Sequence, residues 1–400
     1  MHPQAEGTFS MTPDEQKMIE SIAAREQHWI DLLEQLVNCD SGTWNKDESD
    51  RCSDILTKAI GDLGFAVEQV PQEKVGAHVV ARKPGTGDLS LLFVGHFDTV
   101  FPAGTVAERP FTIDGDRATG PGVYDMKGGL VVLLAALTAL KEASAKVWNE
   151  VNLTVIFNSD EEVLSPTSSP IIAEEAKKAD TACILEPARA GGEYTFQRKG
   201  AGLYKMTVHG RAAHSGGAPE KGRSAVEELS QKIIRLHELI NFDTGTTVNV
   251  GVIRGGIRPN VVAEQAECEF DLRVYTHAER EKAEARFQEI VDMQFVPDTT
   301  TELSGGMMFP PVEHSERNEK LFGVVKDAGK KLGLDLPSVV TGGGSDGNVT
   351  GQYTLLMDGM GVEGDGAHSD REFIVLSSVV RRAQVLTLFL NDWPDRVGEI

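Results

Sequence analysis

Residues 151–162 read VNLTVIFNSDEE, an apolar run that closes on two adjacent glutamates, Glu161 and Glu162. A short apolar run of this length is typical of a buried strand. In parallel α/β sheets, ligands bind beyond the carboxyl ends of the strands. Two adjacent carboxylates at such a strand end can face different ways, so that one binds a metal ion while its neighbour accepts a proton. Metal-assisted hydrolysis requires both roles, because a bound metal ion lowers the pKa of water and a carboxylate that is not a ligand must accept the proton.

Strand patterns and helix patterns alternate along the chain around this stretch. Apolar runs are found at 77–81, 89–94 and 182–185. Helical spacing of apolar residues is found at 13–37, 54–63, 127–142, 318–332 and 376–390. This alternation predicts the α/β class, with a mostly parallel sheet flanked by helices.

A second pattern begins near Arg198 and interrupts the first. Strand patterns lie at 203–208, 246–253 and 261–275, with helical patterns at 224–239 and 278–293. This order is typical of an α+β domain of about one hundred residues. We predict a first domain formed by residues 1–198 and 309–400, and a second domain inserted at residues 199–308.

The composition limits the classes of partner that we expect. The chain has 400 residues, of which 40% are hydrophobic and 25% charged, and its formal net charge is −22. This acidity disfavours binding to nucleic acid or to an anionic membrane surface. No apolar run approaches the roughly 20 residues that span a bilayer. Residues 1–20 lack the basic start and apolar segment of a secretory signal.

The cysteines favour a reducing compartment. Cys39, Cys52, Cys183 and Cys268 are far apart and form no Cys-x-x-Cys pair. This spacing is typical of reduced structural thiols and not of a disulfide framework. We therefore expect a cytoplasmic enzyme.

Acidic and histidine side chains follow three of the predicted strands and occur in two glycine-containing segments. The candidate metal ligands are His96, Asp125, Glu162, Glu186 and His368. Two imidazoles and three carboxylates suit zinc, with cobalt or manganese as substitutes, better than calcium or magnesium. If one carboxylate bridges, such a set can hold two ions roughly 3.5–4 Å apart. Asp125 is the natural bridge, because glycines at 120, 122, 128 and 129 let the backbone turn tightly around it.

Each of these residues also has a simpler interpretation when taken alone. A histidine such as His96 or His368 is more often packed in a turn or solvated in a loop than bound to a metal. Their joint occurrence with carboxylates at strand ends favours the metal site. Asp98, two residues after His96, is placed to accept the other imidazole N–H and to fix the tautomer.

Several motifs resemble those of the dinuclear-zinc peptidases that include aminoacylase, acetylornithine deacetylase and bacterial glutamate carboxypeptidase. They are GHFDTV at 95–100, GPGVYDMKGG at 120–129, DEE at 160–162, LEP at 185–187 and the late histidine His368. The resemblance covers nearly the whole chain. Further segments are similar to the folate-cleaving glutamate carboxypeptidases: ERPFTIDGD at 108–116, RKG at 198–200, GRAAH at 210–214 and GGGSD at 342–346.

The resemblance implies a role for each matching residue of the first domain. It implies two zinc ions with these ligands: His96, Asp125 and Glu186 for one ion, and Asp125, Glu162 and His368 for the other. It also makes Glu161 the general base.

The same resemblance gives the inserted domain the roles of a lid and a dimerisation domain. It implies that His214 reaches the active site of a partner subunit and binds the developing oxyanion, with Asn260 as a companion hydrogen-bond donor. Arg273 would grip the free carboxylate of the substrate, since a planar guanidinium can bind a carboxylate through two parallel hydrogen bonds. The simpler alternatives are a surface salt bridge for Arg273 and a turn histidine without function for His214.

One segment departs from the family pattern. Glu162 is followed by Val163-Leu164-Ser165-Pro166, where the family usually has a glycine-containing turn. This difference removes no candidate ligand. It affects the expected shape of the substrate pocket.

Together these residues and the resemblance predict a dinuclear zinc hydrolase; the resemblance implies a metallopeptidase of the carboxypeptidase type that cleaves the amide bond to a C-terminal amino acid, with glutamate expected. The alternative within the family is an N-acyl amino acid deacylase or dipeptidase. A catalytically silent, metal-bound, peptide-binding dimer is an alternative of another class. A silent relative would be expected to lack the base or a ligand, and this chain has them all. The expected partners are a small acyl-amino acid or peptide substrate and a second copy of the chain.

Overall fold

The computed structural model describes residues 10–189 and 191–400, which form two compact units. Unit 1 consists of the described residues up to Phe196, together with His314–Val340 and Ser345–Ile400. Unit 2 consists of Gln197–Glu313 and Thr341–Gly344. The chain therefore leaves unit 1 after Phe196 and passes back into it, so that unit 2 is an insertion.

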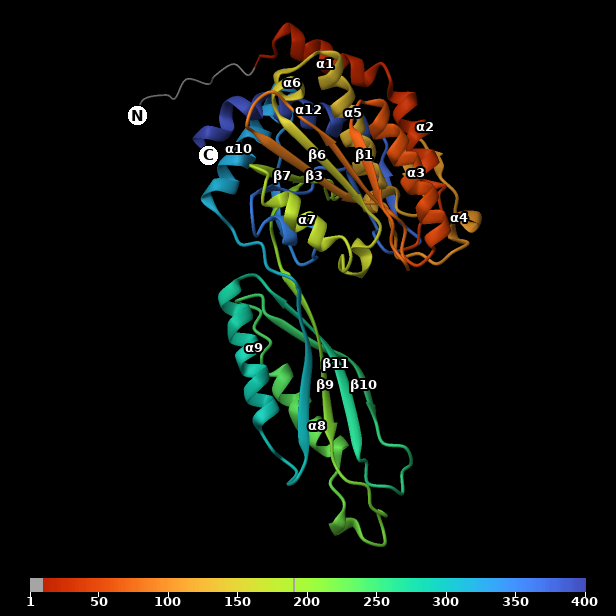
Figure 1. Cartoon of the computed structure of the whole chain (residues 1–400), viewed down its shortest axis with the longest axis vertical. Coiled ribbons are helices and arrows are strands. Elements are labelled where there is room, and N and C mark those ends of the chain that lie inside the picture. Colours follow the sequence, from red (N-terminus) through yellow and green to blue (C-terminus); the bar gives the residue numbers. More distant parts are fainter. Residues whose placement is uncertain (1–9, 190) are drawn as a thin grey trace. The chain divides into compact units, whose positions relative to one another are not determined.

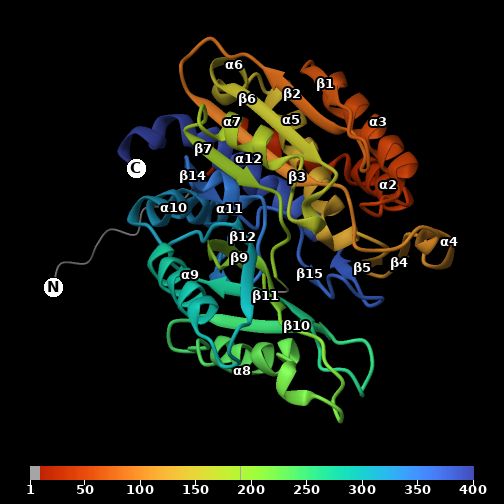
Figure 2. The ribbon, with the colours of Figure 1, turned by 60° about the horizontal axis from the view of Figure 1, so that its bottom comes forward.

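The centre of unit 1 is a sheet that has, among the described residues, six strands in the order β1–β2–β6–β3–β7–β14 (Figure 1, Figure 2). The strands are β1 (Ala66–Val70), β2 (His78–Lys83), β3 (Ser90–His96), β6 (Asn152–Asn158), β7 (Thr181–Ile184) and β14 (Leu355–Met357). Strands β6, β3, β7 and β14 run parallel, whereas β1 and β2 form antiparallel pairs at one side. The predicted mostly parallel sheet flanked by helices is confirmed.

The residues of β3 show how the two faces of this sheet are used. Leu91 and Phe93 belong to a large hydrophobic core, whereas the alternate residues Leu92 and Val94 are buried outside it, on the opposite face. Helices that contribute to the large core include α1 (Pro13–Ala23), α2 (Glu26–Val37), α5 (Gly128–Glu142) and α12 (Ser378–Arg396). On the other face, α7 (Ser169–Ala176) contacts β3 and buries Ile172.

Helix α5 is apolar on all sides because protein surrounds it. Within the described residues, Val123–Glu142 is the one helical stretch long and apolar enough to cross a membrane by length and composition. Its most apolar window is 89% buried inside the structure. A helix that is hydrophobic all round is typical of a buried core position, which is where α5 lies.

A second sheet in unit 1 brings distant segments together. Its strand order is β15–β16–β5–β4, with β4 (Thr112–Asp114), β5 (Arg117–Thr119), β15 (Gly364–Asp365) and β16 (Phe373–Val375). Strands β8 (Tyr194–Arg198) and β13 (Ser338–Thr341) form a two-stranded sheet. The remaining helices and helical turns outside unit 2 are α3 (Lys46–Asp62), α4 (Thr105–Glu108), η1 (Val123–Lys127), α6 (Lys146–Glu150), η2 (Glu161–Val163), α10 (Glu316–Lys331), α11 (Gly347–Thr350) and η4 (Val397–Glu399).

Unit 2 is an antiparallel sheet with two helices packed on one of its faces (Figure 1). The strand order is β10–β11–β9–β12, with β9 (Gly200–His209), β10 (Thr247–Gly255), β11 (Gln265–Val274) and β12 (Thr300–Phe309). The helices are α8 (Ala225–His237) and α9 (His277–Asp292), and a turn, η3 (Pro219–Lys221), precedes α8. In β9, Met206 and Val208 are buried in a core with these helices, whereas Leu203 is 49% exposed.

Candidate metal centre

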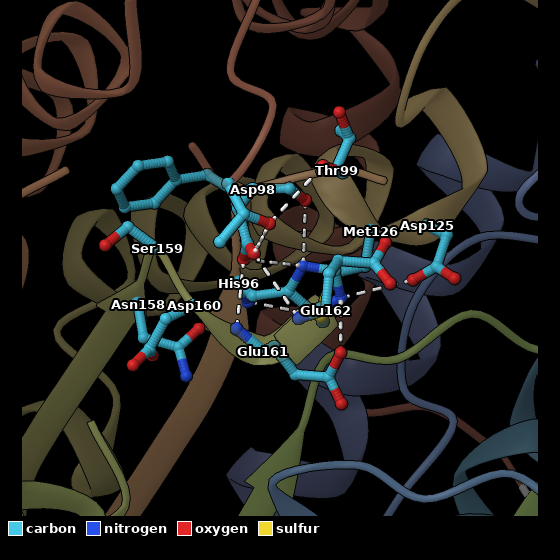
Figure 3. A network of polar contacts seen from close by, with 12 residues as sticks. His96, Asp98, Thr99, Asp125, Met126, Asn158, Ser159, Asp160, Glu161 and Glu162 are labelled. Atoms are coloured by element: carbon cyan, nitrogen blue, oxygen red, sulfur yellow. Dashed lines mark hydrogen bonds and ion pairs between the residues drawn. The ribbon is translucent and has the colours of Figure 1, made fainter. Parts of the chain in front are cut away.

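The candidate ligands lie on elements that meet at one edge of the main sheet of unit 1. Figure 3 shows three of them, His96, Asp125 and Glu162. His96 is the last residue of β3, Glu162 lies in η2 after β6, and Glu186 follows β7. These three strands are parallel neighbours, so their carboxyl ends share an edge. Asp125 comes from η1, directly before α5, and His368 comes from the loop between β15 and β16.

The first group of ligand atoms comes from His96, Asp125 and Glu186, and these atoms all lie within 4.8 Å of one another. His96 Nε2 is 3.2 Å from Asp125 Oδ1 and 3.7 Å from Glu186 Oε1. The side chain of His96 is buried, and Glu186 is also buried. This group therefore offers one imidazole nitrogen and two carboxylate oxygens to a common point.

The second group comes from Asp125, Glu162 and His368, again with all ligand atoms within 4.8 Å of one another. His368 Nε2 is 3.2 Å from Asp125 Oδ2 and 3.0 Å from Glu162 Oε2. Asp125 thus turns Oδ1 toward one histidine and Oδ2 toward the other. This is the arrangement that a carboxylate shared by two metal ions needs.

Asp125 is held in place by Glu372, a residue that the sequence analysis did not identify. The Glu372 carboxylate is buried and accepts hydrogen bonds from the backbone N–H groups of Gly122 (2.9 Å), Tyr124 (2.9 Å) and Asp125 (3.0 Å). Burial raises the pKa of Glu372 to about 7. The position of Glu372 four residues after His368 was the only signal in the sequence, and such spacing in a loop predicts no contact.

Asp98 lies on the far side of His96 from the ligand groups, as Figure 3 shows. His96 Nδ1 is 3.1 Å from the backbone oxygen of Asp98 and 3.4 Å from its Oδ1. The Asp98 carboxylate also accepts a hydrogen bond of 2.7 Å from Thr43 Oγ1, a second residue that the sequence analysis did not identify. These contacts orient the imidazole so that Nε2 faces the ligand groups.

Glu161 lies beside His96 of the first ligand group and belongs to neither group. Its Oε2 is 3.9 Å from His96 Nε2, and its side chain is buried. The backbone N–H groups of Glu161 and Glu162 donate to the two oxygens of Asp98 at 3.2 and 3.3 Å. The turn after β6 therefore places one glutamate among the ligand atoms and leaves the adjacent one next to them.

Burial and close contact shift the pKa values of these groups. Burial raises the pKa of Glu161 well above its usual range. Burial would also raise the pKa of Asp125, but hydrogen bonds from His368 and His96 outweigh it and hold this pKa below its usual value. Hydrogen bonds to Asp125 and Glu162 raise the pKa of His368 to about 10. The histidines must release these protons before they can bind a metal ion.

The side chains present fit a pair of transition-metal ions. Each group combines one histidine nitrogen with two carboxylate oxygens, which is a donor set that zinc, cobalt or manganese accepts. Carboxylates held this close repel one another, and a cation between them offsets the repulsion. The ligand groups are therefore suited to metal binding by their chemistry as well as by their spacing.

The structure places the other predicted site residues in unit 2. His214 is exposed, and its Nδ1 accepts hydrogen bonds from Gly216 and Gly217, each 3.1 Å long. Asn260 lies next to this turn, because its backbone oxygen accepts from Ser215 at 3.1 Å. Arg273 lies in β11, and its Nε donates to both oxygens of Asp271 at 2.9 and 3.0 Å.

Known proteins share this fold and sequence pattern. Residues 92–392 match the peptidase family M20/M25/M40. Carboxypeptidase G2 of Pseudomonas sp. (strain RS-16) is 30% identical over 376 residues, which cover 91% of this chain and 88% of that protein. N-acetyl-L-citrulline deacetylase of Xanthomonas campestris pv. campestris is 25% identical over 349 residues, covering 82% of this chain and 88% of that protein. The crystal structure of aminopeptidase PepT from Bacillus cereus ATCC 10987 has the same fold, with a TM-score of 0.75, 23% identity, and coverage of 92% of this chain and 98% of that chain.

The fold and the paired ligand groups define a metal-dependent peptidase or amide hydrolase. The family match covers most of the chain, and the similarity to carboxypeptidase G2 extends over 91% of it, so together they establish the family. The chain belongs to peptidase family M20/M25/M40 and is a hydrolase. The family expected from the sequence motifs is confirmed.

Proposed function

We propose that this protein is a dinuclear zinc carboxypeptidase that cleaves the amide bond between an acyl group and a C-terminal glutamate. The observation that carries the proposal is the position of Asp125, whose two oxygens face His96 and His368 while the carboxylate of Glu161 lies alongside. Similarity to carboxypeptidase G2 over 91% of the chain supports the carboxypeptidase class.

The two ligand groups would each hold one zinc ion, with cobalt or manganese as substitutes. The residues that would hold them are His96, Asp125 and Glu186 for the first ion, and Asp125, Glu162 and His368 for the second. When bound, such ions lower the pKa of water and polarise the carbonyl of an amide.

The side chains beside the ligands would move and guide the proton. Glu161 takes a proton from the attacking water and passes it to the departing nitrogen, which completes hydrolysis of the amide. Its buried carboxylate is within 3.9 Å of the ligand nitrogen of His96, so it is close to where the water must attack. Asp98 keeps the His96 ring in the orientation that this arrangement requires.

Residues of unit 2 would recognise the substrate. Arg273 would bind the free carboxylate, because a guanidinium can donate two parallel hydrogen bonds to it; in the structure its Nε donates to both oxygens of Asp271. His214 and Asn260 would stabilise the developing oxyanion. We assign His214 to the active site of a partner subunit, in a homodimer formed through unit 2.

A cytoplasmic location is part of the same proposal. Cys39, Cys52, Cys183 and Cys268 are all buried free thiols in the structure. Buried free thiols favour a reducing compartment.

An N-acyl amino acid deacylase is the second candidate function. The similarity to N-acetyl-L-citrulline deacetylase over 82% of the chain favours it, because the same metal chemistry removes a simpler acyl group. The two candidates differ only in the acyl group and the amino acid that the enzyme accepts.

One assay separates the candidates. Metal-loaded protein is incubated with folate or methotrexate, and in parallel with dipeptides and N-acetyl amino acids, each with and without a chelator. Release of glutamate that the chelator abolishes is the expected result. Cleavage of the acetyl compounds alone would transfer the protein to the deacylases, and binding of these compounds without turnover would contradict both proposals.

A further inference from the structure

The turn that follows the predicted general base contains two residues in an unfavourable backbone conformation. This turn, residues 160–168, is named the base turn. Leu164 has φ of 70° and Ser165 has φ of 51°, both in the left-handed region. A side chain with a Cβ atom is crowded there, and glycine is not. This is the segment where the family usually has a glycine-containing turn and this chain has Val163-Leu164-Ser165-Pro166.

Hydrogen bonds to Asp346 hold the base turn in this conformation. Asp346 is 1% exposed and lies just before α11. Its Oδ1 accepts from Ser165 Oγ at 2.5 Å, and its Oδ2 accepts from Asn158 Nδ2 at 2.7 Å. Asn158 is the last residue of β6. The Asp346 carboxylate therefore connects the end of this strand with Ser165 in the base turn through two hydrogen bonds.

The rest of the base turn is fixed by two other carboxylates. Asp160 accepts from the backbone N–H of Thr167 at 2.7 Å and from Ser168 Oγ at 2.5 Å. Asp98 accepts from the backbone N–H of Glu161 at 3.2 Å. Hydrogen bonds therefore hold the backbone at Glu161 and after it. The bonds after Glu161 include the one from Ser165 to Asp346.

We propose that Asp346 is a positioning residue for the general base: it holds the strained base turn closed and thereby keeps the carboxylate of Glu161 beside the metal ligands. This inference rests on the proposed function of Glu161. Asp346 itself contacts Asn158 and Ser165, so it acts on the base through the turn. The strain at Leu164 is the reason that such a fastening is needed in this chain.

The strain is tested by comparing Leu164→Gly with Leu164→Ala in the full chain. Both variants remove the leucine side chain, but only alanine keeps a Cβ atom in the left-handed conformation. We expect the glycine variant to unfold at a temperature higher than the alanine variant by roughly 1–3 °C. At an unstrained site the order is reversed, since glycine costs more conformational entropy. An alanine variant that is as stable as the glycine variant, or more stable, would overturn the assignment of strain.

The positioning role is tested with Asp346→Asn, Ser165→Ala and the double variant. Each single variant is expected to lower kcat by between about 10- and 100-fold while KM stays within about twofold, because a small displacement of the base affects the chemical step and not substrate binding. The double variant is expected to lose little more than the worse single variant, since both act through one contact. If Asp346→Asn does not fold, Ser165→Ala alone carries the test.

Two controls separate positioning from general damage. Cobalt bound to each variant is measured by its visible absorption, which is expected to keep the stoichiometry of the unchanged protein. Glu175→Gln alters a buried carboxylate in α7 that Arg82 contacts at 2.7 Å, and it is expected to lower stability without lowering kcat. An unchanged kcat in folded, cobalt-binding Ser165→Ala protein would overturn the proposal. If the unchanged protein hydrolyses none of the substrates, the proposed function fails, while the comparison at Leu164 still tests the strain.

Discussion

Glu372 and Asp125 are joined by a hydrogen bond of 3.0 Å from the Asp125 backbone N–H to Glu372 Oε1, although 247 residues separate them in the chain. The same carboxylate accepts from Gly122 and Tyr124, so it fixes the loop that carries the shared ligand. The pairing of β16 with β5 brings the two segments together. Glu372 therefore supports the metal centre without contributing a ligand atom to either group found among the described residues.

Replacing Glu372 with glutamine is expected to weaken zinc binding by about 10- to 100-fold, because supporting contacts of this kind orient the ligand. Glutamine has one acceptor oxygen where the carboxylate has two, and its N–H₂ group would face backbone donors. Competition with a chromogenic chelator measures the affinity. Glu363→Gln is the matched control, since Glu363 binds Arg381 at 2.6 Å and not the Asp125 loop. Equal zinc affinity for the unchanged protein and Glu372→Gln would contradict the role of Glu372.

Glu161→Gln is expected to abolish turnover while zinc stays bound. A general base contributes about 10²- to 10⁴-fold to the rate, and glutamine cannot accept the proton. The neighbouring variant Glu162→Gln should behave differently, because Glu162 Oε2 is 3.0 Å from His368 Nε2 in the second ligand group. Steady-state kinetics together with zinc content after dialysis distinguish the two. Near-normal kcat in Glu161→Gln would remove this residue from the mechanism.

The strand-end rule explains why much of the site could be predicted from the sequence. His96, Glu162 and Glu186 each follow or end an apolar run, and parallel neighbours bring such ends together without further information. Thr43 and Glu372 could not be found in this way. Their contacts depend on the conformations of loops at the sheet edge, and the periodic pattern of apolar residues does not predict loop conformations.

Strand β12 was not predicted from the sequence, because its pattern of alternating apolar residues is broken. The strand contains Gly305 and Gly306 and has a register irregularity between Met307 and Phe309. The helical pattern predicted over residues 13–37 is two helices, α1 and α2, that meet at Ala24 and Arg25. No glycine or proline marks that break, which is set by packing on α5 and α12.

The metal stoichiometry of His368→Ala tests the assignment of two sites. The His368 side chain is 54% exposed, so its removal is expected to leave the fold intact. The unchanged protein should hold two zinc ions per chain and the variant about one, because the first ligand group does not include His368. Elemental analysis after dialysis measures the ratio. His314→Ala, which removes a histidine 2.8 Å from Glu319, is the control that should keep both ions. Two ions in His368→Ala would contradict the second ligand group.

Lys331, which belongs to neither ligand group, contacts carboxylates on two other helices of unit 1. Lys331 Nζ, in α10, donates to Glu15 Oε1 of α1 at 2.6 Å and to Asp392 Oδ2 of α12 at 2.7 Å. Burial would raise the pKa of Glu15, but its hydrogen bonds with Lys331 and Thr12 outweigh burial and lower this pKa. Burial would lower the pKa of Lys331, but its hydrogen bonds to Asp392 and Glu15 raise it. Burial raises the pKa of Asp392 although its hydrogen bond with Lys331 lowers it, so protonation of Asp392 in acid also removes an attraction to Lys331.

Lys331→Met is expected to lower the free energy of unfolding by about 1–3 kcal/mol at pH 7, because it leaves the buried Glu15 carboxylate without its cation. A lowered carboxyl pKa gives stability above the ordinary value of 4.5, and this stability is lost as the pH falls through the folded-state pKa. A raised lysine pKa gives stability that is lost only as the pH rises above 10.5. The difference between the two proteins should therefore be present at pH 7 and shrink as the pH falls, because protonated Glu15 and Asp392 no longer attract Lys331. Urea unfolding at several pH values measures it, with Lys330→Met as the control, since Lys330 pairs at the surface with Asp327. A difference that grows as the pH falls would contradict the assignment to Glu15 and Asp392.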